Sequence, residues 1–62
     1  MAVDPYVVAE INGSKRCIGP FRSYLSADGW AKGMFDVYSI VHYDSPKYTR
    51  IAPEKAEDRM RG

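Results

Sequence analysis

Cys17 and His42 are the only side chains in this 62-residue sequence that are suited to nucleophilic or general-base chemistry near neutral pH. A catalytic cysteine needs a histidine within hydrogen-bond distance and donors that stabilise an oxyanion. The strands expected to carry these two residues are not neighbours, and no third group completes the set. We therefore predict a packed thiol, a histidine at a sheet edge and no enzymatic activity.

The sequence contains no pattern for a metal or a phosphate-bearing cofactor. A structural zinc site needs four Cys or His side chains around one ion, and the chain has one of each. Gly19-Pro20-Phe21 is not a phosphate-binding loop, because proline removes a backbone N–H from the centre of the cradle. We predict no metal and no cofactor.

Three basic side chains, Lys15, Arg16 and Arg22, lie near the expected hairpin tip and helix start, where phosphates of nucleic acid could be bound. Nine Lys and Arg against eight Asp and Glu leave a formal charge of only +1. This balance is not typical of a nucleic-acid-binding domain. DNA binding through the basic hairpin therefore ranks as a second hypothesis, behind protein binding.

The strongest structural signal is a β-hairpin within residues 6–18. Two runs of β-forming residues enclose Asn12-Gly13, a pair that favours a type I′ turn because both central residues need a positive φ. A two-residue loop fixes the register of the strands, so that Val8 faces Cys17.

A helix is expected from about Tyr24 to about Lys32, with Ser23 as its N-cap and Gly33 as its C-cap. Four apolar residues follow the helical spacing and form one stripe: Ala27, Trp30, Ala31 and Met34. We expect this stripe to pack on the hairpin, and the loss of Trp30 to unfold the domain.

Residues 37–43 predict a third strand that is apolar on both sides. Because the helix returns the chain, this strand can lie antiparallel beside the first, which gives the spatial order 2-1-3. The predicted fold class is α+β, a ββαβ arrangement in which one helix covers one face of a three-stranded antiparallel sheet. The predicted core comprises Val7, Ala9, Ile11, Ile18, Phe21, Trp30, Ala31, Met34 and Ile40.

We divide the chain into a ββαβ domain at 1–46 and a C-terminal segment at 47–62. Pro53 suits the first turn of a short helix, and charges alternate after it, so this segment is expected either to dock as a helix or to extend as a charged tail. The sequence shows neither a signal-peptide pattern nor an apolar run of membrane-spanning length. The expected location is therefore the cytoplasm, with no membrane partner.

The motif Ile18-Gly19-Pro20-Phe21-Arg22-Ser23, followed by Ala27, Trp30-Ala31 and Tyr38-Ser39-Ile40-Val41, resembles a pattern in small uncharacterised proteins of actinobacterial phages. This resemblance implies a phage origin and an accessory role in binding a protein of the bacterial host. The same stretch resembles one half of a SPOR domain, a peptidoglycan-binding module of bacteria. That resemblance implies peptidoglycan binding as a third hypothesis, with a dimer supplying the second half.

One helix can cover only one face of the predicted sheet. The other face is expected to carry Tyr6, Val8 and Cys17 from the hairpin, and contiguous apolar patches with tyrosines are typical of interfaces. The third strand contributes either Val41 and Tyr43 or Tyr38 and Ile40, depending on which way it faces. The predicted partner-binding residues are Tyr6, Val8, Cys17, Val41 and Tyr43. We expect another protein or a second copy of the chain to cover this face; the alternative cover is the C-terminal tail from Tyr48 to Met60.

Overall fold

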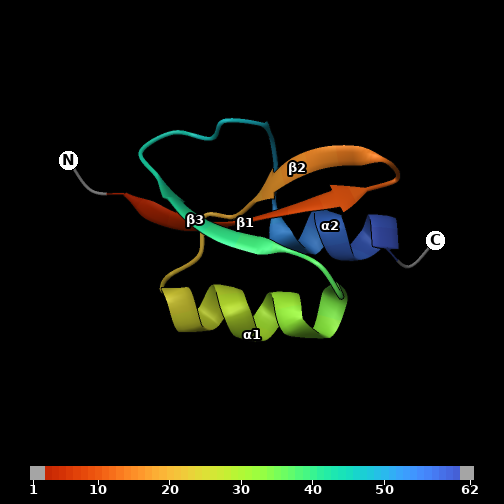
Figure 1. The fold of residues 1–62 in the computed structure, drawn as a ribbon, viewed down its shortest axis with the longest axis horizontal. Coiled ribbons are helices and arrows are strands. Elements are labelled where there is room, and N and C mark those ends of the chain that lie inside the picture. Colours follow the sequence, from red (N-terminus) through yellow and green to blue (C-terminus); the bar gives the residue numbers. More distant parts are fainter. Residues whose placement is uncertain (1–2, 61–62) are drawn as a thin grey trace.

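The structure is a computed structural model that describes residues 3–60. Within these residues the chain forms, in order, β1 (Asp4–Ile11), β2 (Ser14–Ile18), α1 (Tyr24–Met34), β3 (Ser39–Tyr43), β4 (Thr49–Ile51) and α2 (Pro53–Met60). The strands make one mixed sheet in the order β3-β1-β2-β4. Both helices lie on one side of this sheet, and the β3–β4 connection arches over the other side (Figure 1).

The predicted hairpin is confirmed in its turn and in its register. Asn12 and Gly13 have φ values of 53° and 82°, as a type I′ turn requires. Val8 lies opposite Cys17, and Val7 lies opposite Ile18. Because side chains alternate along a strand, this register separates the apolar residues of the hairpin between the two faces of the sheet.

The predicted strand order 2-1-3 is correct for the first three strands, because β3 lies antiparallel beside β1. The sheet is not purely antiparallel, however. β4 pairs with β2 in the parallel direction and aligns Ile51 with Ile18. β4 has only three residues and includes Arg50, so the sequence shows no clear strand pattern there. The strand is favoured because it buries Ile51 within the core.

Helix α1 begins where the sequence predicted. Ser23 is the N-cap, and its hydroxyl accepts a hydrogen bond from the backbone N–H of Ser26 at 3.2 Å. This contact satisfies one of the N–H groups that have no partner inside the helix.

The predicted end of the helix was wrong. Gly33 lies inside α1, which continues to Met34, and Phe35 is the C-cap in an extended conformation. The Phe35 ring packs edge-on against Trp30, with 5.9 Å between the ring centroids. This packing accounts for a helix that runs past the glycine.

Strand β3 begins at Ser39, two residues later than predicted. The Tyr38 hydroxyl donates a hydrogen bond of 2.8 Å to Oδ1 of Asp28 on α1, which holds the chain toward the helix at this point. Val37 consequently lies outside the sheet and is 85% exposed.

The core lies between the sheet and the two helices. Its buried residues are Val7, Ala9, Ile11, Ile18, Ala27, Ala31, Ile51 and Ala56. Phe21, Trp30 and Ile40 pack against this cluster but are only partly buried, and Met34 is half-buried. The predicted core is thus largely correct, and Val7 and Ile18 are the largest of its fully buried side chains.

The C-terminal segment is ordered as β4 and α2 in the described residues. Helix α2 begins at Pro53, and Ala56 is fully buried in the helix-side core. β4 and α2 therefore do not cover the opposite face of the sheet. Of the tail from Tyr48 to Met60 that the alternative prediction assigned to this role, Tyr48 does reach that face, where its ring contacts Lys15. Neither helix in residues 3–60 is long and apolar enough to cross a membrane.

Candidate interaction surface

The sheet face that points away from the helices is the candidate surface, and we call it the crossed face because residues 44–48 pass over it (Figure 1). Tyr6 lies opposite Val41, and Val8 lies opposite both Cys17 and Ser39. Paired residues share a face, so the third strand contributes Val41 and Tyr43 to this surface. The crossed face comprises Asp4, Tyr6, Val8, Glu10, Lys15, Cys17, Ser39, Val41, Tyr43 and Arg50.

The five predicted partner-binding residues all lie on the crossed face, but they differ in accessibility. Tyr6 and Cys17 are buried, whereas Val8, Val41 and Tyr43 are half-buried. The rings of Tyr6 and Tyr43 pack with their centroids 6.0 Å apart. Tyr6 and Cys17 thus form the floor of the surface, and the accessible residues are Val8, Val41 and Tyr43, whose binding role stays a prediction.

Two lysine–tyrosine contacts join the crossing segment to the sheet. The Lys15 ammonium lies 5.5 Å from the centroid of the Tyr48 ring, and the Lys47 ammonium lies 6.0 Å from that of Tyr43. Exposed cation–π contacts of this kind contribute about 0.5–1 kcal/mol each. Desolvation raises the pKa of Tyr43 above its usual value, with smaller electrostatic contributions from Cys17 and Tyr48.

Sequence reasoning missed Lys47 as part of this surface, and it included Tyr48 only in the alternative in which the C-terminal tail covers the face. Both were assigned to the C-terminal segment, because the parallel return of the chain across the sheet has no short-range pattern. Pro46 just before them indicated only that β3 had ended.

The Gly19-Pro20 corner supports the floor of the crossed face. The peptide bond between these residues is cis, and Gly19 has a φ of 148°. The Phe21 N–H donates to the Pro5 carbonyl at 3.0 Å, which fastens the corner to β1. A Cβ at Gly19 would lie 3.1 Å from Cδ2 of Tyr6, so glycine is required for this close approach.

Cys17 and His42 are kept apart by the sheet. Cys17 is paired with Val8 on the crossed face, while His42 is paired with Pro5 on the helix side. The His42 ring stacks on Tyr24 of α1 with an interplanar angle of 7° and a centroid distance of 6.4 Å. In the part of the chain that the structure describes, no three His, Cys, Asp or Glu side chains could hold a metal ion.

The three basic residues of the second hypothesis do not come together at the hairpin. Lys15 and Arg16 are consecutive on β2, so their side chains project from opposite faces of the sheet. Arg22 is exposed just before α1. The structure places Lys15 beside Tyr48 instead.

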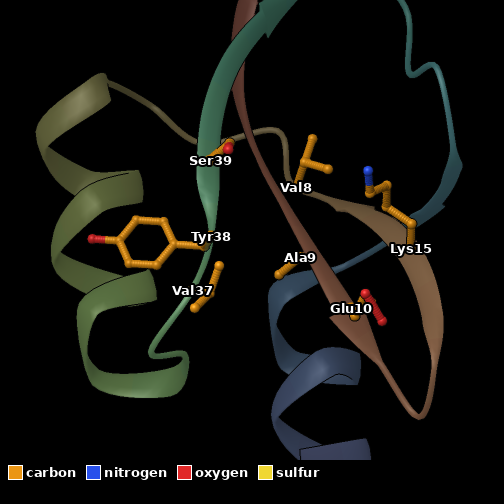
Figure 2. Close-up of a pocket in the computed structure, with 7 residues that line it drawn as sticks. All are labelled: Val8, Ala9, Glu10, Lys15, Val37, Tyr38 and Ser39. Atoms are coloured by element: carbon orange, nitrogen blue, oxygen red, sulfur yellow. The ribbon is translucent and has the colours of Figure 1, made fainter.

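A cavity of about 350 Å³ opens where β1 and the segment before β3 separate, beyond the pair of Val8 and Ser39. Its lining residues are Val8, Ala9, Glu10, Lys15, Val37, Tyr38 and Ser39 (Figure 2). Val37 and Ala9 project toward each other across the gap, whereas the Tyr38 hydroxyl points away toward α1 (Figure 2). The hydrogen bond to Asp28 is the main cause that raises the pKa of Tyr38. The lining offers one carboxylate and one ammonium but no thiol or imidazole.

The fold and the site define a small α+β domain in which one sheet face is covered by helices and the other by a short crossing segment. Comparison of the chain with known proteins found no matching family model, no matching curated protein and no matching solved structure. The function must therefore be argued from the surface itself.

Proposed function

We propose that this protein is a small non-enzymatic binding protein that contacts another protein through its crossed face. The observation that carries the proposal is the ring of half-exposed residues around the buried Tyr6. Val41 is its cross-strand partner, Tyr43 packs on its ring, and Val8 follows it on the same face of β1. Such a contiguous patch of aliphatic and tyrosine side chains is typical of the centre of a protein interface.

The surroundings of this patch indicate the chemistry of the partner. Tyr48 is 42% exposed beside the patch, and tyrosines bury a large apolar area while keeping a polar hydroxyl at the rim. Lys15 and Lys47 lie on the tyrosine rings. Asp4 and Glu10 are exposed on the same face, so a partner with an apolar centre and a rim that carries both signs of charge fits this arrangement. The suggestion that it is a protein of a bacterial host rests on the phage resemblance alone.

Site-specific photo-crosslinking tests the proposal directly. A photoreactive phenylalanine analogue is introduced at Val41 on the crossed face, and at Gly33 on the solvent side of α1 as the matched control. A Cβ at Gly33 meets nothing within 4 Å, so the control does not disturb the fold. Exposure in a bacterial lysate should give a defined protein adduct from position 41 and not from position 33. Identical adduct patterns, or no adduct from position 41, would rule out the crossed face as the binding surface.

Single-stranded nucleic acid is the second candidate ligand for the same face. Two tyrosines with ammonium groups on their rings resemble, in chemistry, the stacking platforms that bind bases and phosphates. Tyr43→Ala combined with Lys47→Ala should then abolish binding of a fluorescent oligonucleotide at low salt. Affinity in the unmodified protein should fall steeply with salt, because bound phosphates release counterions. A protein that shows no anisotropy change at low salt would eliminate this candidate.

A further inference from the structure

The two edges of the sheet are protected to different degrees. The β4 edge has three residues, one of which is Arg50, and Pro53 follows the strand after the single residue Ala52. The β3 edge has five residues, Ser39-Ile40-Val41-His42-Tyr43, with no proline, lysine, arginine or carboxylate. Charged residues, prolines and short length are the usual devices that prevent edge strands from pairing with other chains. β3 has none of the three.

The register shows which backbone groups of β3 face outward. The Pro5 carbonyl accepts from Phe21, so the Pro5 backbone is directed to the β2 side of β1. Pro5 lies opposite His42, and hydrogen-bonded and non-hydrogen-bonded pairs alternate along an antiparallel ladder. The N–H and C=O groups of His42, and those of Ile40 two residues earlier, therefore point away from β1 toward the open edge.

Exposed apolar side chains gather at this same edge. Leu25 is 80% exposed and Tyr24 is 53% exposed. Tyr24 lies against His42 of β3. Leu25 is the next residue of α1, about 100° farther around the helix, which directs it outward past the edge, away from the core.

We propose that β3 pairs antiparallel with β3 of a second copy of this chain, around a two-fold axis at Val41. Ile40 of each copy exchanges backbone hydrogen bonds with His42 of the other. The two Val41 side chains meet on the crossed face, where directly opposed Cβ atoms lie about 5 Å apart. Since β3 carries no formal charge, no like charges are brought together.

The helices favour a second copy over an unrelated extended peptide. α1 lies beneath β1 and β3 (Figure 1), and the two-fold axis places the two α1 helices side by side under the joined sheet. Tyr24 is level with His42, so Tyr24 and Leu25 fall close to the axis and meet their own counterparts. In a two-fold interface the same surface of each copy contacts its counterpart, so self-complementary contacts of this kind are expected there. An extended peptide would pair with β3 but would leave Leu25 in water.

Sedimentation equilibrium over about 1 μM to 1 mM protein tests the proposal. The mass should rise from 7.0 kDa to twice that value as the concentration increases. Leu25→Glu should weaken the association about 100-fold or more, because an apolar side chain is lost from both sides of the axis. Gly33→Glu adds the same charge to the solvent side of the same helix, where a Cβ meets no atom within 4 Å, and should leave the association unchanged.

A second variant tests the strand pairing separately from the helix contact. His42→Pro removes an outward N–H and none of the hydrogen bonds to β1, a position at which edge strands tolerate proline. It should also give a monomer with a native circular dichroism spectrum. A protein that stays at 7.0 kDa throughout, or a dimer that withstands Leu25→Glu, would overturn the proposal. The pairing covers Val41 but leaves Val8 and Tyr43 uncovered. A crosslink from position 41 to a second copy of the chain would report this dimer, and a crosslink to a different protein would report the crossed-face proposal, so the two failures are distinguishable.

Discussion

The two faces of the sheet bury similar kinds of residue under very different covers. On the helix side, Val7 and Ile18 lie beneath α1 and α2. On the crossed face, Tyr6 and Cys17 are also buried, and the cover on this side of the sheet is the β3–β4 connection rather than a helix (Figure 1). Elements with few buried apolar contacts open at lower free energy than the core of a domain. We therefore expect the cover of the crossed face to open at a lower free energy than the helix side.

Substitutions at the neighbouring residues Cys17 and Ile18 of β2 should show the largest difference in stability between the two faces. Ile18→Ala removes three carbon atoms from the middle of the helix-side core and should cost about 2–5 kcal/mol. Cys17→Ala removes one sulfur atom from the floor of the crossed face and should cost about 1 kcal/mol. Both side chains are fully buried at 0% exposure, so the difference reflects size and surroundings. Urea denaturation followed by circular dichroism measures the free energy of unfolding of both variants. Equal losses of stability would contradict the view that the helix side contributes more to stability than the crossed face.

Replacement by alanine should lower the stability of the domain at Gly19, in the corner after β2, and raise it at Gly29, in α1. Gly19→Ala places a Cβ 3.1 Å from Tyr6 at a φ of 148°, and such strain costs about 1–3 kcal/mol. Gly29→Ala is the matched control, because a Cβ there meets nothing within 4 Å. It should stabilise α1 by about 1 kcal/mol, since alanine is the better helix former. If both substitutions changed the free energy of unfolding in the same direction, the close approach of Gly19 to Tyr6 would be contradicted.

The success of the sequence-based predictions depended on the range of the interactions. The turn at Asn12-Gly13 and the N-cap at Ser23 are set by neighbouring residues, and both are confirmed. The C-cap prediction at Gly33 was wrong because Phe35 packs on Trp30. The parallel strand β4 was missed because Ile51 pairs with a strand more than thirty residues earlier.

The candidate site shows the same limit. Alternation along β1 and β2 correctly grouped Tyr6, Val8 and Cys17 on one face. It could not indicate that Tyr6 and Cys17 would be buried, because that depends on how residues 44–48 cross the sheet. Local patterns thus identified the face, and only the tertiary structure identified its accessible residues.

The reactivity of the Cys17 thiol should report how firmly the crossing segment is held. The thiol is free and buried, so a disulfide reagent should modify it slowly in the native state and fast in denaturant. Tyr48→Ala removes the ring under the Lys15 ammonium and should raise the native rate severalfold, since a contact of about 0.5–1 kcal/mol is lost. Tyr24→Ala, which removes a ring from the helix side, should leave the rate unchanged. Equal acceleration by both variants would indicate global unfolding as the route of access.

The smallest expected effect concerns Tyr38, at the boundary between the two faces. Its hydroxyl donates to Asp28, and this hydrogen bond raises the pKa of Tyr38 in the folded state above its usual value. A group with a raised folded pKa stabilises the fold fully below its unfolded pKa of about 10 and loses that contribution as pH rises through the folded pKa. Tyr38→Phe should therefore lower stability at neutral pH, and the difference from the unmodified protein should shrink above about pH 10. Urea unfolding of both proteins across this range, followed by the fluorescence of Trp30, measures the difference. Asp28→Asn should return the pKa of Tyr38 toward its usual value, and a difference that stays constant with pH would show that the Asp28 contact does not form in solution.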